Sequence, residues 1–348
     1  MHRRAKRFFI EYSPSPHEFY CLNAARYNLA NMSSPPISTA VVIGTGMMGP
    51  GISLVLALGG VSTTLVSRTS EGAARGLESV RVQAAVLLGN QLADAETVSG
   101  ALARVSASTA LEPAAASAGL VIESGPEDLA YKQALFEQLD RVSPPTALLA
   151  SNTSSLSITQ IARGCQYRNR IMTAHFWNPP LLVPLVEIVC GEDTNAPFAD
   201  DLRRLLAACG KVPVMVRKDR PGQLGNRLQV AMIREAAHMV AEGIATAEDV
   251  DLAIQNGLGL RFPAYGLLTH QDNVGLDLTL AVNAYVSPDL YRSPEPPPYL
   301  SQLVARGDLG VKTGQGFFDW TQRSAEDAKA KRDQFLIDFL RTQRNRLD

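Results

Sequence analysis

The sequence lacks an excess of charge of either sign: it has 33 basic and 34 acidic side chains in 348 residues, with a formal net charge of −1. A balanced chain has no long-range field that would attract nucleic acid or an anionic membrane, so we expect a small-molecule partner. It also lacks an apolar run of about 18 residues, the length that a membrane-spanning helix needs. The apolar stretch Ile52 to Val61 is too short and is interrupted by Gly59 and Gly60.

Cysteine is scarce, and its four copies lie far apart, without a Cys-x-x-Cys pair or a Cys/His cluster. This pattern is typical of ordinary thiols in a reducing compartment and offers no zinc site, so we expect no bound metal. The cysteines are Cys21, Cys165, Cys190 and Cys209.

The first 37 residues differ from the rest of the chain. Residues 2–7 are basic apart from Ala5, but acidic residues and prolines follow before residue 19 and spoil an amphipathic helix. Arg-rich starts can be organelle targeting peptides. We favour a disordered extension and a cytoplasmic protein, and a mitochondrial location stays open in case the basic N-terminus is a transit peptide.

After Pro36 the hydrophobic pattern predicts strands that alternate with helices, including an alanine-rich helix over residues 71–104. From Pro221 onward it predicts helices alone. We therefore expect an α/β fold, with a doubly wound sheet over residues 38–218 and an all-helical domain over residues 219–348. The predicted strands are residues 41–43, 62–66, 120–122, 147–150, 171–177, 185–189 and 213–216.

A glycine-rich turn follows the first predicted strand and precedes an apolar helix. Gly44-x-Gly46-x-x-Gly49 has the spacing of a dinucleotide-binding loop, with Met47 and Met48 before its last glycine. The first glycine makes the tight turn, the second lets the backbone approach the pyrophosphate, and the third lets helix and strand pack closely. Strand, turn and helix in this order predict a Rossmann-type domain that binds a dinucleotide here.

The end of the second predicted strand bears on which dinucleotide binds. An NAD site usually has an acidic residue there for the ribose hydroxyls, whereas this chain has Ser67, Arg68 and Thr69. These residues offer hydrogen-bond donors and a positive charge to a 2′-phosphate. We therefore favour NADP(H) over NAD(H), although Arg68 could instead stack on adenine or face water.

A histidine and a glutamate lie in successive strand-like segments. Glu187 stands within Leu185 to Val189, where an ionised carboxylate is costly unless it is paired. His175 lies near the end of the preceding segment, before the turn at residues 178–180. A carboxylate that accepts from one imidazole nitrogen fixes the tautomer and leaves the other nitrogen for proton transfer. A core histidine and an unrelated surface glutamate would fit the spacing equally well.

Several motifs stand in a characteristic order along the chain. They are Ala150 to Leu156, His175 to Pro179, Pro184 to Val189, Pro221-Gly222 with Asn226-Arg227, and Lys312 to Phe318. In order and spacing they resemble the 3-hydroxyacyl-CoA dehydrogenase family, including its lambda-crystallin-like hydroxy-acid dehydrogenases. The resemblance runs from about Val41 to Trp320.

The resemblance implies a role for each matching residue. His175 would be the general base in alcohol oxidation and the general acid in ketone reduction, with Glu187 orienting it. Ser154 and Asn226 would hydrogen-bond the reacting oxygen, and Asn178 would shape the turn beside the site. The residues expected near the cofactor are Glu127, Lys132 and Asn152.

Two departures from the family leave the substrate open. Residues 70–110 contain Arg75, Arg81 and Arg104 but no lysine, where the family carries lysines for the phosphates of coenzyme A. Lys132 remains available on the next predicted helix. The segment Arg261 to Gly266 also differs from the family near the acyl site.

The leading expectation is an NAD(P)-dependent enzyme of the kind found in fatty acid metabolism. It would interconvert a 3-hydroxyacyl-CoA, or a related β-hydroxy compound, and its 3-keto form. One alternative is an enzyme that acts on a free hydroxy acid or a secondary-metabolite ketone. A less favoured alternative is a non-catalytic, crystallin-like protein that only binds the nicotinamide cofactor. Because family members commonly pair through the helical half, we also expect a homodimer.

Overall fold

The computed structural model describes residues 37–344, so the expected N-terminal extension lies outside the described residues except for Ile37. The chain forms two compact units. Unit 1 comprises residues 37–224 and 332–344, and unit 2 comprises Gly225–Lys331. The division therefore falls after Leu224, where the sequence predicts it after residue 218, and the end of the last helix belongs to unit 1.

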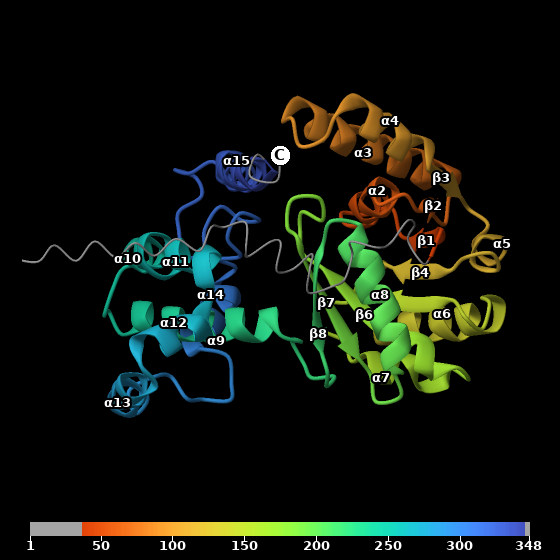
Figure 1. Cartoon of the computed structure of the whole chain (residues 1–348). Coiled ribbons are helices and arrows are strands. Elements are labelled where there is room, and N and C mark those ends of the chain that lie inside the picture. Colours follow the sequence, from red (N-terminus) through yellow and green to blue (C-terminus); the bar gives the residue numbers. More distant parts are fainter. Residues whose placement is uncertain (1–36, 345–348) are drawn as a thin grey trace, which may run out of the picture. The chain divides into compact units, whose positions relative to one another are not determined.

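Unit 1 is built on one eight-stranded sheet with helices on both faces (Figure 1). The strand order is β3-β2-β1-β4-β5-β6-β7-β8, whose first six strands have the 3-2-1-4-5-6 order of a Rossmann domain. Every neighbouring pair is parallel except β6 and β7, which are antiparallel. The strands are β1 (Thr39–Ile43), β2 (Ser62–Val66), β3 (Val105–Ser108), β4 (Leu120–Glu123), β5 (Leu148–Ser151), β6 (Ile171–Phe176), β7 (Leu185–Cys190) and β8 (Val212–Val216).

Two hydrophobic layers cover the sheet, because alternate residues of a strand point to opposite faces. Ala40 and Val42 of β1 belong to one layer, with α2 (Gly49–Leu58), α3 (Ser70–Gly89), α4 (Ala95–Ala103) and α8 (Ala196–Ala208). Val41 and Ile43 belong to the other. That second layer contains α5 (Leu111–Ala115), α6 (Leu129–Val142), α7 (Ile158–Ile161) and the start of η2 (Ala162–Gly164). A short turn of helix, η3 (Arg168–Arg170), leads into β6.

The helix expected over residues 71–104 is two helices, and this part of the prediction is wrong. The chain turns after α3, where Gln91 has a φ of 56°, and Asp94 then caps α4 by accepting from the amide of Thr97. The strand β3 was also missed, because its four residues are only partly buried at the edge of the sheet and form no apolar run. The other predicted strands are found within one or two residues of their expected limits.

Unit 2 is helical. After its helix Pro298–Arg306 the chain forms a compact turn, held by bridges between Gly310 and Gln315 and between Gln315 and Asp319. Its helices are α9 (Gly225–Ala241), α10 (Ala247–Ala253), η4 (Ile254–Leu258), α11 (Gly259–Tyr265), α12 (Leu267–Val274), α13 (Leu276–Val286) and α14 (Pro298–Arg306). The last helix, α15 (Ala325–Arg344), begins in unit 2 and ends in unit 1. The expected fold class, a Rossmann-type sheet followed by an all-α domain, is confirmed. Over residues 37–344, no helix is long and apolar enough to cross a membrane.

Candidate active site

The glycine loop joins β1 to α2 in the way its spacing predicts. Gly44 has a φ of +110°, and a Cβ there would lie 2.4 Å from the carbonyl oxygen of Ser124. A Cβ on Gly49 would lie 1.8 Å from the carbonyl oxygen of Gly44, whereas one on Gly46 would meet no atom within 4 Å. The first and third glycines are therefore required by close packing, and the second leaves open space beside the start of α2. A helix N-terminus with such space is suited to a pyrophosphate.

The end of β2 carries Ser67, Arg68 and Thr69, which the sequence predicts beside the ribose of the cofactor. Thr69 caps α3 by accepting from the amide of Gly72, and the Ser67 hydroxyl lies 3.5 Å from that of Thr45. Arg68 is exposed. Burial and the Glu123 carboxylate raise the pKa of Tyr131, and the charge of Arg68 partly opposes them.

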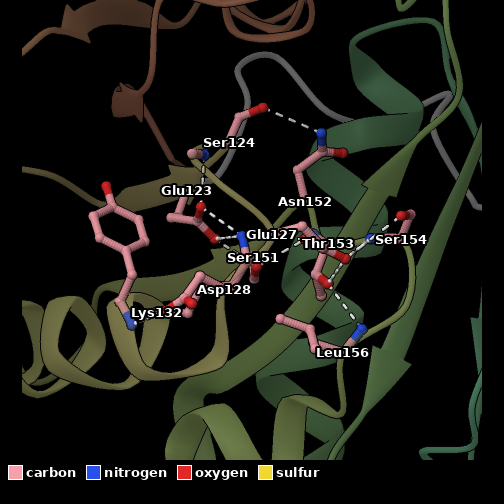
Figure 2. Close-up of polar contacts among 12 residues, drawn as sticks. Glu123, Ser124, Glu127, Asp128, Lys132, Ser151, Asn152, Thr153, Ser154 and Leu156 are labelled. Carbon is pink, nitrogen blue, oxygen red and sulfur yellow. Dashed lines mark hydrogen bonds and ion pairs between the residues drawn. The ribbon is translucent and has the colours of Figure 1, made fainter.

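A chain of hydrogen bonds connects the glycine loop to the strand that carries His175. The Ser124 amide donates to the carbonyl oxygen of Ile43, at the end of β1 (2.8 Å). The Asn152 side chain donates to the Ser124 hydroxyl (3.2 Å, Figure 2) and accepts from the amide of Phe176 (2.8 Å). Asn152 thus joins the carboxyl ends of β4 and β6, which keeps the predicted cofactor loop and the predicted base at one edge of the sheet.

His175 and Glu187 face each other across the antiparallel pair. They are register partners of β6 and β7, and Nδ1 of His175 lies 2.8 Å from Oε2 of Glu187. The glutamate side chain is fully buried and the histidine side chain is 10% exposed. A buried carboxylate costs several kcal/mol unless it is paired, and the contact with Nδ1 of His175 supplies a partner for Glu187. The pairing expected from the sequence is present, and the alternative of a surface glutamate is wrong.

A buried ion pair lies next to this edge, at the start of α6. Nζ of Lys132 lies 2.7 Å from both carboxylate oxygens of Glu123, and the two side chains are 1% and 0% exposed (Figure 2). Glu123 also accepts from the Ser151 hydroxyl and from the amide of Gly125, both at 2.6 Å. Because its ammonium group is buried, Lys132 is not available to substrate phosphates, and that expectation is wrong.

Glu127 holds the loop that follows β5. It accepts from the amides of Ser154 and Ser155 and from the hydroxyls of Thr153 and Ser155, at 2.6–3.1 Å, and Nζ of Lys132 lies 3.6 Å from its other oxygen. Burial alone would raise the pKa of Glu127, but the bonds from Thr153 and Ser155 and the charge of Lys132 outweigh it and lower the pKa. The carboxylate is therefore ionised at neutral pH, and it fixes the backbone at Ser154.

The roles of the remaining expected site residues stay predictions. Ser154 is exposed, and its hydroxyl lies 3.5 Å from Glu127. Asn226 lies on α9 in unit 2, and Asn178 lies in the exposed turn after β6. In the glycine loop, Met47 is exposed and Met48 stands at the N-cap of α2.

Two contacts of Glu187 were missed by the sequence analysis. The indole nitrogen of Trp177 donates to Oε2 at 2.9 Å, and the amide of Leu224 donates to Oε1 at 2.9 Å. The first had a signal in the sequence, because residues two apart in a strand lie on the same face, and Trp177 is two residues after His175. The second had none, because it is made by the backbone of a residue 37 positions away.

Comparison with known proteins identifies the family. Residues 39–220 match the NAD binding domain of 3-hydroxyacyl-CoA dehydrogenase, and residues 222–320 match its C-terminal domain. The chain belongs to the 3-hydroxyacyl-CoA dehydrogenase family. The family resemblance stated from the motifs is confirmed, and the protein is an NAD-dependent oxidoreductase of this family that acts on a CH–OH group.

The relatives of this 3-hydroxyacyl-CoA dehydrogenase family member are named for two kinds of substrate, a CoA ester or a pyridine carboxylate. A probable 3-hydroxybutyryl-CoA dehydrogenase of Bacillus subtilis is 36% identical over 83% of this chain and 99% of its own. A 5-formyl-3-hydroxy-2-methylpyridine 4-carboxylate 5-dehydrogenase of Mesorhizobium japonicum is 30% identical over 86% of this chain and 96% of its own. A crystal structure of a 5-dehydrogenase for the same pyridine acid, described as an NAD+ dependent dismutase, has a TM-score of 0.81 at 29% identity, over 88% of this chain and 98% of that one.

Proposed function

We propose that the protein interconverts a β-hydroxy compound and its β-keto form, with His175 and Glu187 as the acid/base dyad. The observation that carries the proposal is the 2.8 Å contact between Nδ1 of His175 and Oε2 of Glu187. It lies at the same sheet edge as a glycine loop suited to a dinucleotide. The strands β1, β4, β5 and β6 are neighbours in the sheet. A dinucleotide held at the end of β1 would therefore extend along their carboxyl ends toward His175.

The proton chemistry follows from the imidazole tautomer. With Nδ1–H donated to Glu187, the Nε2 atom of His175 is unprotonated and can take the hydroxyl proton of the substrate during oxidation. In the reducing direction the protonated ring returns that proton to the oxygen, and Glu187 stabilises the cation. In this proposal the Ser154 hydroxyl and the Asn226 amide bind the reacting oxygen and align it, which lowers the cost of the charge that develops there.

The chain offers residues that fit the cofactor. We propose that the glycine loop and the start of α2 bind the pyrophosphate, since a Cβ at Gly46 would meet no atom within 4 Å. When bound, the nicotinamide ring donates hydride in the reducing direction and accepts it in the oxidising direction. The other residues proposed to line the cofactor site are Met47, Met48, Ser67, Arg68, Glu127 and Asn152. Lys132 would act indirectly, through its contact with Glu127.

The preference for NADP(H) is part of this proposal and goes beyond the family match, which supports NAD alone. Arg68 is exposed and follows the partly buried Ser67 in the chain, so the end of β2 offers a positive charge and a hydroxyl to a 2′-phosphate. The ratio of kcat/KM for NADPH to that for NADH tests it. Ser67→Asp should lower this ratio at least about tenfold by charge repulsion, and Arg141→Ala, at an exposed arginine on α6, should leave it unchanged. A wild-type ratio well below one would contradict the NADP(H) preference.

The substrate class has two candidates. Membership of the family and the Bacillus subtilis relative favour a 3-hydroxyacyl-CoA. A free acid without coenzyme A is favoured by the lack of lysine in residues 70–110, by Arg81 being paired with Glu78, and by the pyridine-carboxylate relative. Acetoacetyl-CoA and acetoacetate, tested in parallel, distinguish the two.

The decisive test is NADH and NADPH oxidation with acetoacetyl-CoA by wild-type protein, His175→Ala and Glu187→Gln. Loss of the general acid should lower kcat by about 10²- to 10⁴-fold. His238→Ala, at a histidine on α9 that packs against Tyr291, is the matched control and should retain full turnover. Unchanged turnover in His175→Ala would overturn the proposed function and revive a cofactor-binding protein without catalysis.

A homodimer is also proposed. Unit 2 exposes many large apolar side chains, and a monomer rarely exposes contiguous apolar patches larger than a few hundred Å². Among the most exposed are Leu260, Leu268, Leu280 and Tyr285. Light scattering on the purified protein should give twice the chain mass of 37.5 kDa, and Leu268→Glu with Leu280→Glu should reduce it toward the monomer.

A further inference from the structure

Trp177 lies beside the proposed dyad and contacts it directly. It follows β6 at two residues after His175, and the two ring centroids are 5.8 Å apart. Its indole Nε1 donates to Oε2 of Glu187 at 2.9 Å, and Nδ1 of His175 lies 2.8 Å from the same oxygen. The same carboxylate oxygen is therefore a hydrogen-bond partner of both side chains.

Neighbours of the Glu187 carboxylate come from several elements of unit 1. Its other oxygen, Oε1, accepts from the amide of Leu224 at 2.9 Å. The residue opposite Glu187 on the neighbouring strand β8 is the apolar Val214. From β6, the titratable partner is His175. On the other side of β6, Lys132 pairs with Glu123 and also lies 3.6 Å from Glu127, and Glu127 accepts from the loop residues Thr153 to Ser155.

We propose that Trp177 is a positioning residue that moderates the base strength of His175 through Glu187. This inference rests on the proposed function. A carboxylate oxygen that accepts two hydrogen bonds offers less of its charge to each donor, so the imidazolium form of His175 gains less from it. The indole also fixes the plane of the carboxylate, which keeps Oε2 in line with Nδ1.

The substitution Trp177→Phe isolates this effect, because it keeps an aromatic ring and removes the N–H donor. Oε2 would then accept one hydrogen bond fewer and interact more strongly with His175, so the ring would hold its proton to higher pH. We expect the midpoint of the His175 titration to rise by about half a pH unit, a fraction of the strength of a charge-assisted hydrogen bond.

Nuclear magnetic resonance measures this without a substrate. The chain has five histidines, and the His175 signals are those that disappear in His175→Asn. The titration is compared in wild type, Trp177→Phe, Glu187→Gln and the double variant. The midpoint should rise in Trp177→Phe and should not differ between Glu187→Gln and the double variant. An unchanged midpoint in Trp177→Phe, or an equal rise in the Glu187→Gln background, would overturn the proposal.

A second measurement uses the wild-type chain, in case Trp177→Phe does not fold. The chain has two tryptophans, and the indole N–H signal of Trp177 is the one that remains in Trp320→Phe. This signal should move with the same midpoint as the His175 ring, and a signal that does not respond to pH would overturn the proposal.

Turnover separates this inference from the proposed function. In the oxidising direction, the acid limb of the kcat/KM profile should move to higher pH in Trp177→Phe by the same amount as the His175 signals, and should not move in Trp320→Phe. A shift in the signals with no shift in the profile would overturn the role of Trp177 in catalysis. Full turnover in His175→Ala would instead overturn the proposed function, whatever the titrations show.

Discussion

Replacement of Lys132 by methionine gives a direct test of how the proposed active-site edge is held. Lys132 and Glu123 are buried to within 1% exposure, and Nζ lies 2.7 Å from both carboxylate oxygens. Methionine fills nearly the same space but removes the positive charge. Glu123 would keep its bonds from Ser151 and Gly125, yet its negative charge would remain buried without a counter-ion.

The expected loss of stability is large, because removing one partner of a buried ion pair typically costs about 3–5 kcal/mol. The double variant Lys132→Met with Glu123→Gln removes both charges, so it should recover at least about 1 kcal/mol of that loss. As a matched control, Arg81→Met breaks the ion pair with Glu78, whose side chains are 61% and 64% exposed. An exposed pair contributes about 0–1 kcal/mol, so this control should stay close to wild type.

Urea unfolding followed by far-ultraviolet circular dichroism measures all four proteins. The free energy of unfolding is obtained by linear extrapolation, and equal m-values are needed for the comparison. A Lys132→Met protein within 1 kcal/mol of wild type, or a double variant no more stable than the single one, would refute the view that this buried pair stabilises the sheet edge.

Other predictions concern glycines, a buried lysine and thiols. Gly49→Ala should prevent folding, because its Cβ would lie 1.8 Å from a carbonyl oxygen, whereas Gly46→Ala should keep its melting temperature and lose cofactor affinity, measured by calorimetry. Burial lowers the pKa of Lys211 to about 8 from 10.5, so the native state releases this proton first. Wild type should therefore gain stability relative to Lys211→Met as pH rises from 8 to 10, by up to about 1.4 kcal/mol per unit, and a constant difference would contradict this. Burial raises the pKa of the Cys165 and Cys209 thiols to about 12, so iodoacetamide at pH 8 should leave both unmodified in the native protein by mass spectrometry.

Much of the fold was predictable because the hydrophobic pattern is strong where strands are buried on both faces. The strand Ser62–Val66 is found at its predicted limits, and the glycine spacing correctly located the turn between β1 and α2. Edge elements were harder. The missed strand β3 is partly exposed and has the sequence Val-Ser-Ala-Ser, whose alternation of apolar and polar residues is only four residues long and contains a single large apolar side chain.

The role of Lys132 was not predictable, because a lysine on a predicted helix is usually exposed. Its burial depends on Glu123, which ends β4 nine residues earlier and is itself fully buried. Sequence spacing indicated neither side chain's direction. The interpretation of Lys132 as an available cation was wrong because its pairing with Glu123 is a tertiary contact between a helix and a strand.

The antiparallel direction of the two strands that carry His175 and Glu187 could have been predicted from the length of their connection, although their register could not. The two residues are 12 positions apart, and residues 177–184 alone separate β6 from β7. A parallel crossover needs about a dozen residues or more, usually with a helix, so a connection this short requires an antiparallel pair. In an antiparallel pair, the last residues of the first strand face the first residues of the second. A histidine near the end of one strand and a glutamate near the start of the next can then face each other, and the observed register pairs them. The reversal of one strand in an otherwise parallel neighbourhood is therefore what creates the proposed dyad.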